Sequence, residues 1–534
     1  MLSEDKYFKD LTEAELWQRY CGFLDLTIDE FMAMQEELLM DQIDRVAGSI
    51  LGEKIMNNHR PKSVEEFRRM VPLTTYDDYE PYLSEQREDV LAIKPDGWVH
   101  SSGRGGNFKW VPWGQEFVAK LAKCMLSGFI LSLTKQKGRV NIYPGFRFLL
   151  LLPAAPYASG YLFQSLIEDY FSFQAIPPLE TAERMEFQDR IKEGFQRSLR
   201  DGVDAIAALS SVLVRIGEEF SGEARSMKLS ASMLHPKIVC RLLGALLRSK
   251  RERRKLLPKD LWPAKGILTG GADTAIYRDA IVRYWGNDPL EFYGGAESGL
   301  IATQAWNKKM LTMLPDLAFL EFIPDDELLK EQNTLGYQPS TVLLDALQVG
   351  KSYEIVVTQL YGMPLLRYRL RDIVKVIALS DDESGVKLPQ IVFQHRLGET
   401  IKLAGLAELD EKVIWQAIAN TGIKYTEWAA CKEFDHNQAF IRIYLELKQK
   451  KKAAEIASDI DQQLRLTDTD YRDIDSYLKF QPVRVTLLEQ GTFQRYMDEK
   501  RKEGADLAHT KPSHINAPPS VIERLLELSQ AIEE

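Results

Sequence analysis

Two short apolar runs, each ending in a glycine pair, flank a helical pattern in the middle of the chain. Residues 267–271 and 290–295 carry these runs. The residues between them repeat apolar side chains at helical spacing until the breakers at 286–289: Tyr277, Ile281, Tyr284 and Trp285. The pattern predicts strand, glycine-rich turn, helix, strand and a second such turn. In an α/β sheet such turns lie at the carboxyl ends of strands, where ligands bind, so this stretch is the first candidate site.

The rest of the first 395 residues alternates between helical and strand patterns. Helices are expected at 11–24 and 28–50, and helical segments are expected to fill 161–256. The apolar run 147–160 is typical of a fully buried strand entering a loop. Residues 340–378 alternate as strands, and 98–114 is expected to be a loop. This sequence of elements predicts an α/β fold in which mixed β-sheets are flanked by helices.

The pattern changes after Arg396. Residues 440–447 and 482–488 alternate as strands on either side of a helical segment, 451–466. We therefore expect a large N-terminal domain, residues 1–395, and a small mobile α+β domain, residues 396–534. The hinge is placed near 396–399. Gly398 is the expected pivot because glycine tolerates large backbone changes, although a rigid linker fits the sequence equally well.

Composition and charge exclude several classes of protein. The 534 residues include 68 basic and 78 acidic side chains, a formal charge of −10, so no electrostatic footprint for nucleic acid is present. No apolar run approaches the roughly 20 residues that span a bilayer, and the charged N-terminus is not a secretory signal. Four scattered cysteines indicate no disulfide or zinc framework. We expect a cytoplasmic protein without a membrane partner, whose basic cluster at 248–255 is a solvated helix end.

Three positions carry candidate chemistry. The segment 100–112 combines serines, glycines and Lys109, which suits a phosphate-cradling loop, although a flexible surface loop fits it equally well. Glu297 follows the second glycine pair as an isolated carboxylate. Asp372 precedes an apolar strand and is either a strand-end carboxylate or a turn residue.

Taken together, these motifs resemble the adenylate-forming superfamily of acyl-CoA synthetases, in their order and spacing. The closer resemblance is to the auxin-responsive Gretchen Hagen family of acyl acid amido synthetases, and it extends from about residue 70 to residue 512. Its pieces are Val71-Pro-Leu-Thr-Thr-Tyr, Ser101-Ser-Gly with Lys109 and Pro112, Leu261-Trp-Pro, Arg367-Tyr-Arg with Asp372, Gly491-Thr-Phe-Gln-Arg-Tyr-Met-Asp498 and Lys511-Pro512.

The resemblance implies a reaction in two halves. A carboxylic acid attacks ATP with Mg²⁺ to give an acyl-adenylate, and an amine, typically of an amino acid, then takes the acyl group. Catalysis is then implied for Lys511 and for Glu297, which also binds Mg²⁺. Nucleotide binding is implied for Ser101, Ser102, Gly103, Lys109, Gly270, Gly271, Ala272, Tyr293, Gly294, Gly295, Ala296, Asp372, Arg396 and Lys402. Part of the acyl pocket is expected within 149–160.

Departures from the family pattern leave two alternatives. Arg104 and Gly105 replace a usual hydroxyl residue, and Arg371 replaces a glycine, so a non-catalytic relative that binds nucleotide or acyl ligand is one alternative. Transfer of the acyl group to a thiol such as coenzyme A is the other. Thr492 stands where acyl-CoA synthetases carry a lysine, which favours the amido synthetase over the thiol reaction.

Overall fold

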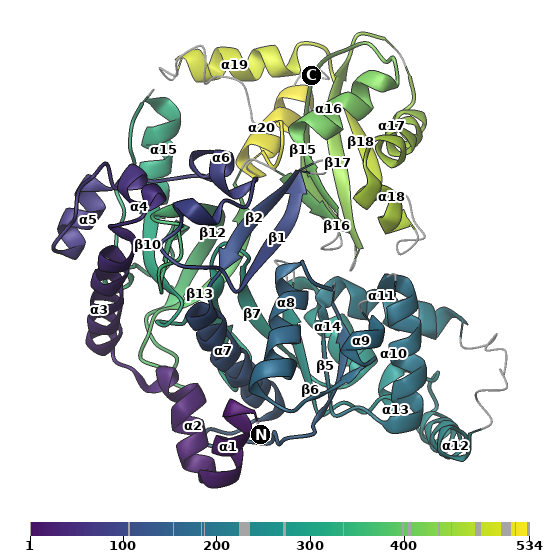
Figure 1. Ribbon diagram of the computed structural model, residues 1–534. Helices are drawn as coiled ribbons and strands as arrows, with labels where there is room; N and C mark the ends of the chain where they lie inside the picture. Colours follow the sequence, from purple (N-terminus) through teal and green to yellow (C-terminus); the bar gives the residue numbers. More distant parts are fainter. Residues whose placement is uncertain are drawn as a thin grey trace.

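A long mixed β-sheet with helices on both faces runs through the centre of the protein (Figure 1). The computed structural model describes residues 2–104, 107–152, 154–182, 184–185, 187–223, 235–270, 274–334, 336–397, 400–403, 407–435, 438–449, 451–475, 482–502, 514–517 and 519–530. No helix in these ranges is both long and apolar enough to cross a membrane.

The described strands fall into four sheets. Their bounds are β1 Gly97–Arg104, β2 Asn107–Trp113, β3 Arg147–Leu151, β4 Gln174–Ile176, β5 Ala205–Leu209, β6 Gly266–Gly270, β7 Pro289–Gly295, β8 Gly299–Gln304, β9 Leu311–Met313, β10 Ala318–Pro324, β11 Ser352–Gln359, β12 Tyr368–Ala378, β13 Gln390–Arg396, β14 Thr400–Leu403, β15 Ala407–Asp410, β16 Tyr425–Asp435, β17 Gln438–Leu447 and β18 Val483–Leu488. The central sheet has the order β10-β11-β12-β13-β9-β8-β7-β6-β5-β3-β4. Hairpins β1-β2 and β14-β15 and the sheet β16-β17-β18 lie outside it.

The helices lie on both sides of these sheets. Their bounds are α1 Ser3–Asp10, α2 Glu13–Cys21, α3 Ile28–Val46, α4 Ile50–Ile55, α5 Val64–Met70, α6 Glu80–Leu83, α7 Gln115–Leu133, α8 Ala158–Ser165, α9 Leu179–Ala182, α10 Phe187–Asp201, α11 Ser210–Glu223, α12 Pro236–Arg251, α13 Pro258–Leu261, α14 Thr274–Trp285, α15 Asp325–Asn333, α16 Glu411–Asn420, α17 Ala453–Thr467, α18 Thr469–Asp475, α19 Thr492–Lys502 and α20 Pro519–Gln530.

Strands β4, β3, β5, β6 and β7 form the parallel half of the central sheet. Their side chains alternate between two separate cores, as the two-residue period of a strand requires. Leu149 and Ile206 face a core shared with α10, α11 and α14. Phe148 and Ala205 face the other core, shared with α7. Both faces are therefore covered, which explains why these strands read as continuous apolar runs.

The remaining strands of the central sheet pair antiparallel, from β7 through β8, β9, β13 and β12 to β11 and β10. The switch from parallel to antiparallel pairing occurs at β7, directly after the helix α14. Strand β12 carries Asp372 and lies in the antiparallel half, whereas β6 and β7 carry the glycine pairs. The candidate residues thus come from both halves of one sheet.

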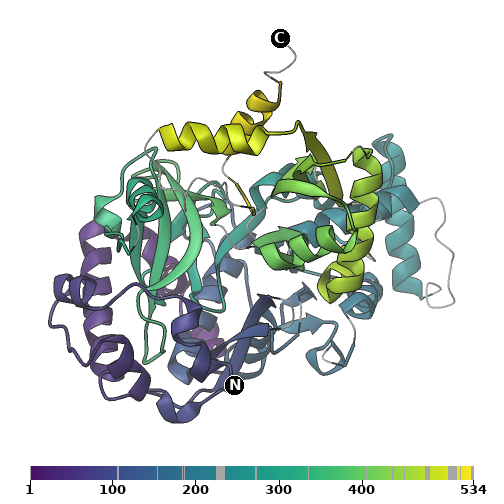
Figure 2. The same cartoon turned by 90° about the horizontal axis from the view of Figure 1, so that it is seen from above.

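The C-terminal elements, from β14 to α20, enclose apolar cores of their own, which contain Trp428 and Phe493. They lie over the edge of the sheet to which the parallel strands point (Figures 1 and 2). The hairpin strand β1 lies against β15, and the ring centroids of Phe434 and Tyr277 are 6.3 Å apart. The α/β fold class is confirmed, while the domain boundary at 396–399 stays a prediction.

Three sequence-based expectations about local structure are wrong. The segment expected to be a loop, 98–114, is the antiparallel hairpin β1-β2, in which Ser101 pairs with Lys109. The segment 161–256 is not wholly helical, because β4 and β5 interrupt it. The helix expected over 28–50 ends at Val46, and Ser49 caps a new helix by accepting a hydrogen bond from the amide of Gly52.

Candidate active site

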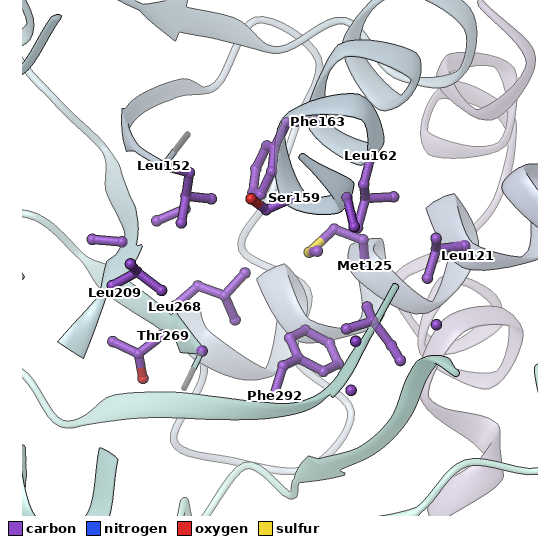
Figure 3. Close-up of a pocket in the computed structure, with 18 of the residues that line it drawn as sticks. Leu121, Met125, Leu152, Ser159, Leu162, Phe163, Leu209, Leu268, Thr269 and Phe292 are labelled. Carbon is purple, nitrogen blue, oxygen red and sulfur yellow. The ribbon is translucent and has the colours of Figure 1, made fainter. Parts of the chain in front are cut away.

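A cavity of about 220 Å³ lies at the carboxyl ends of the parallel strands. Its walls come from β5, β6 and β7 on one side and from α7 and α8 on the other (Figure 3). The residues labelled in the close-up are mostly aliphatic or aromatic, among them Leu121, Met125, Leu162, Phe163, Leu268 and Phe292. Such a concave apolar site at the strand ends is the usual place for a small ligand in an α/β fold.

Glycines form the rim of this cavity where the sequence placed its glycine pairs. Gly270, Gly294 and Gly295 line it. A Cβ on Gly294 would lie 2.0 Å from the carbonyl oxygen of Gly299, so β7 and β8 pair closely only because this position has no side chain. A Cβ on Gly270 would meet no atom within 4 Å, so open space faces that strand end.

Tyr293 connects the two halves of the sheet at this site. Its hydroxyl donates a hydrogen bond of 2.8 Å to Oδ2 of Asp372, although β7 and β12 are not neighbours in the sheet. Arg371, directly before Asp372, has φ +61°, the left-handed conformation that glycine adopts most easily. The backbone here thus has a glycine-type conformation without a glycine, and it presents Asp372 to Tyr293.

Glu297 lies on a turn that its neighbours hold from three sides. Trp113 Nε1 donates to the carbonyl of Ala296 at 3.0 Å, and Gln359 Nε2 donates to the carbonyl of Glu297 at 2.8 Å. The amide of Gly295 donates to Oγ of Ser298 at 3.1 Å. The residue is buried, with 7% of its surface exposed. All three contacts use backbone atoms of the turn, so none of them needs the Glu297 carboxylate.

Tyr76 places the β1-β2 hairpin next to this turn. Its hydroxyl donates to the carbonyl of Trp110 in β2 at 3.1 Å, and Nζ of Lys109 lies 5.6 Å from the centre of its ring. Burial raises the pKa of Tyr76, and the negative charges of Glu297 and Glu80 raise it further, against the effect of the Trp110 carbonyl. Lys109 and Glu297 therefore approach the same tyrosine.

Several predicted site residues are only partly described. For Ser101, Ser102 and Gly103 the structure gives their place in β1, and for Arg396 it gives the backbone pairing with Asp372. Lys402 lies in β14, opposite Glu408, and no described contact joins it to the cavity. Gly271, Ala272, Gly398 and Lys511 lie outside the described residues.

Comparison with known proteins agrees with this architecture. Models of the GH3 family N-terminal, central and C-terminal domains match residues 22–185, 311–396 and 410–519, about two thirds of the chain. The chain belongs to the GH3 family. The closer resemblance that the sequence indicates, to the Gretchen Hagen (GH3) family, is thereby confirmed.

Individual relatives and solved structures are similar over most of their length. The indole-3-acetic acid-amido synthetase GH3.8 of Oryza sativa subsp. indica is 23% identical and is aligned over 90% of this chain and 88% of its own. The structure of the AtGH3.15 acyl acid amido synthetase in complex with 2,4-DB covers 97% of both chains at 17% identity and a TM-score of 0.52. A 2-hydroxyisobutyryl-CoA ligase covers 88% of this chain and 86% of its own at 12% identity and a TM-score of 0.53. These structures share the fold of adenylate-forming enzymes with this GH3 protein.

The sequence did not indicate several residues that pack against the cavity wall or bind the Glu297 turn in this GH3 protein. Gly128 in α7 is one of them, because a Cβ there would lie 1.8 Å from the ring of Phe292, so this glycine lets the cavity wall pack against the helix. Trp113 and Gln359 are others, since both bind the Glu297 turn from distant elements. None of these three residues stands in a motif. The strand β5 was missed as well, although the short apolar run after Asp204 is a sequence signal for it.

His514 fixes the chain three residues after Lys511. Its Nδ1 lies 2.5 Å from Oε1 of Glu411 and its Nε2 lies 2.8 Å from Oε1 of Glu427, while its ring stacks on Trp428 at 4.7 Å. Its carbonyl accepts a hydrogen bond of 2.6 Å from the amide of Ala430 in β16. The chain that enters the undescribed segment 503–513 from its C-terminal side is thus held to the sheet of the C-terminal elements.

The contribution of His514 to the stability of the GH3 protein is expected to decrease as the pH rises. Burial alone would lower the pKa of His514, but its hydrogen bonds with Glu427 and Glu411 raise the pKa above the ordinary value. Because the pKa of His514 is higher in the folded than in the unfolded protein, its contribution to the free energy of unfolding is complete below the unfolded pKa, about 6.5. This contribution is lost as the pH rises through the folded pKa. Thermal unfolding between pH 6 and pH 9 should therefore show a smaller pH dependence in His514→Gln than in the wild type. An equal reduction in the exposed control His59→Gln would contradict this assignment.

Proposed function

We propose that this protein is an ATP-dependent acyl acid amido synthetase, which adenylates a carboxylic acid and transfers the acyl group to an amino acid. The observation that carries the proposal is the junction of an apolar cavity with the turn that bears Glu297, at the carboxyl ends of the parallel strands. Membership of the GH3 family supports it. Curated relatives named as amido synthetases for indole-3-acetic acid and as jasmonoyl-amino acid synthetases support the same reaction class.

The cavity is the proposed site of the acyl group. No charged side chain lines it among the described residues, so it suits the apolar body of an acid. Leu152, Ala158 and Ser159 belong to the stretch expected to contribute to an acyl pocket, and all three line it. The carboxylate of the acid then lies at the glycine rim, towards Glu297.

The residues at the rim fit a nucleotide with a magnesium ion. Open space faces Gly270, where a Cβ would enter the cradle, and Asp372 offers carboxylate oxygens suited to ribose hydroxyl groups. No cluster of three or more metal-ligating side chains occurs among the described residues. A single carboxylate at Glu297 suits Mg²⁺ that arrives with the phosphates of ATP, because Mg²⁺ commonly takes one or two protein carboxylates and substrate oxygens. When bound, the ion offsets phosphate charge.

Positioning and charge neutralisation are what phosphoryl chemistry asks of the protein. In the proposal, Glu297 orients the ion, Asp372 and Tyr293 hold the nucleoside, and Lys109 with the serine strand lies beside the phosphates. Arg396, at the end of β13, and Lys402, in β14, are proposed to reach the nucleotide, and Lys511 is proposed to supply a cation to the reacting carboxylate. Thr492 is fully buried and donates its hydroxyl to the carbonyl of Glu489, so the position where acyl-CoA synthetases have a lysine faces away from solvent here.

Pyrophosphate release from ATP, measured across a panel of carboxylic acids with and without amino acids, tests the proposed function. We expect release that depends on the acid, followed by an amide product when an amino acid is added. A thioester formed with coenzyme A in place of an amide would assign the thiol alternative. Binding of ATP without pyrophosphate release, for any acid, would support the non-catalytic alternative.

A further inference from the structure

One side chain in the mostly apolar cavity wall, that of Ser159, has a polar group that bonds to no other described residue. The lining includes three described side chains with polar atoms, those of Trp113, Ser159 and Thr269. The indole Nε1 of Trp113 already donates to Ala296, and the hydroxyl of Thr269 donates to the carbonyl of Leu290 at 3.1 Å. Ser159 comes from α8, on the wall opposite Thr269 and Phe292 (Figure 3).

The hydroxyl of Ser159 is available to a ligand. Its side chain makes no hydrogen bond to another residue in the described part of the chain, and the residue is partly exposed. It also lines a smaller cavity of about 30 Å³, which shares Leu152 and Phe163 with the larger one. Ser159 therefore lies where the two cavities meet. A hydroxyl at this point can donate to an acceptor and accept from a donor on the same ligand.

We infer that the acid has a compact apolar body that carries no charge besides its reacting carboxylate and has one hydrogen-bonding group, such as a hydroxyl, and that Ser159 recognises this group. The inference rests on the proposed function, because it takes the cavity as the acyl site. It adds the substrate class and names Ser159 as a specificity-determining residue.

The size of the cavity limits the acid. About 220 Å³ is below the range of roughly 300–1,000 Å³ that holds drug-sized ligands. At about 30 Å³ for each small group, as in liquid water, it holds about seven non-hydrogen atoms besides the carboxylate. An acid with a second carboxylate in this region would bury an unpaired charge, which is costly, since the described lining offers no cation.

Matched acids test the hydrogen-bonding group. Phenylacetic, 3-phenylpropanoic and 4-phenylbutanoic acids are compared with their ring-hydroxylated forms, and kcat/KM is measured by pyrophosphate release. We expect the wild type to prefer one hydroxylated acid over its parent by about 2- to 10-fold, the range of one neutral hydrogen bond. Ser159→Ala should bring this ratio close to one. Ser165→Ala, on the same helix but outside the cavity lining, should keep the ratio of the wild type.

Direct binding separates failure of this inference from failure of the proposed function. Calorimetric Kd values for the same acid pairs carry the same expected ratio, whether or not the protein releases pyrophosphate. Absence of pyrophosphate release with a Ser159-dependent binding preference would refute the enzyme but keep the acid class. A wild type that binds hydroxylated and parent acids equally, or a preference that survives in Ser159→Ala, would overturn the role of Ser159. Tighter binding of 1,4-phenylenediacetic acid than of phenylacetic acid would overturn the inference that the acid carries no second charge.

Gly270→Ala tests the size limit independently. The added methyl group meets no atom within 4 Å and the backbone at Gly270 needs no left-handed conformation, so the fold tolerates the change. The methyl group enters the cavity, because Gly270 lines it. Because Gly270 also belongs to the proposed nucleotide cradle, Kd values of the acids are measured by calorimetry without ATP. We expect the preference for phenylacetic over 4-phenylbutanoic acid to rise at least several-fold relative to the wild type. An unchanged chain-length preference would show that the acyl body lies elsewhere.

Discussion

Replacing Arg367 by methionine is expected to lower the free energy of unfolding by about 3–5 kcal/mol, the range for breaking a buried ion pair by removing one partner. Arg367 Nε and Nη2 donate to the two carboxylate oxygens of Glu321 at 3.0 and 2.8 Å. Glu321 is fully buried and the Arg367 side chain is only 6% exposed. Without the guanidinium, the carboxylate of Glu321 remains in the interior with Thr341 as a donor and Arg68 Nε 3.5 Å away, but without its bidentate partner.

The same guanidinium also connects the N-terminal helices to the central sheet. Its Nη1 donates to the carbonyls of Arg68 and Val71 at 2.6 Å each. Arg367 directly precedes β12, the strand that leads to Asp372, so its loss should loosen both the sheet and the candidate site. Urea unfolding followed by tryptophan fluorescence measures the effect, with the first transition as the readout because a chain of this size need not unfold in two states.

Two variants control this measurement. Arg45→Met removes an exposed pair with Asp41 and Glu116, and such pairs contribute about 0–1 kcal/mol. The double variant Arg367→Met with Glu321→Leu also removes the buried carboxylate and should recover much of the lost free energy of unfolding. An unfolding transition of Arg367→Met that matches that of Arg45→Met would show that the buried pair contributes no net stability.

The sequence predicts those helices and strands that are determined by residues close together in the chain. The apolar runs at 267–270 and 290–293 lie in β6 and β7, and Gly286 ends α14 with φ +84°. The glycine pairs are informative because tight turns and close strand pairing exclude side chains, as the contact between Gly294 and Gly299 shows. Local composition thus identifies one edge of the sheet, the edge at which the cavity lies.

Contacts between distant elements are what the sequence does not predict. The bond from Tyr293 to Asp372 spans 79 positions and joins strands that are not neighbours. Trp113 reaches Ala296 over 183 positions, and no periodicity in either segment signals that contact. The hairpin β1-β2 was missed because its serines and glycines have low strand propensity, whereas pairing with a neighbouring strand decides the outcome.

The strongest expected loss of activity belongs to Glu297. Glu297→Gln keeps the shape of the side chain and removes its charge, and we expect pyrophosphate release to fall about 100- to 1,000-fold, as for loss of one preorganised electrostatic contact. The contacts of Trp113, Gln359 and Ser298 with this turn should survive the change, because all three use backbone atoms. A magnesium titration of the residual activity should show a weaker response than in the wild type, since a neutral amide oxygen is a poorer ligand for a hard cation.

Glu80→Gln is the matched control for this charge change. Glu80 is exposed, and its carboxylate acts on the same Tyr76 as that of Glu297, but it lies outside the glycine turn. We expect it to keep the activity and the magnesium response of the wild type. A Glu297→Gln variant with an undiminished magnesium response would remove this carboxylate from metal binding. A loss shared equally by both variants would assign the effect to the general negative potential near Tyr76, because only a ligand role requires the charge at the turn itself.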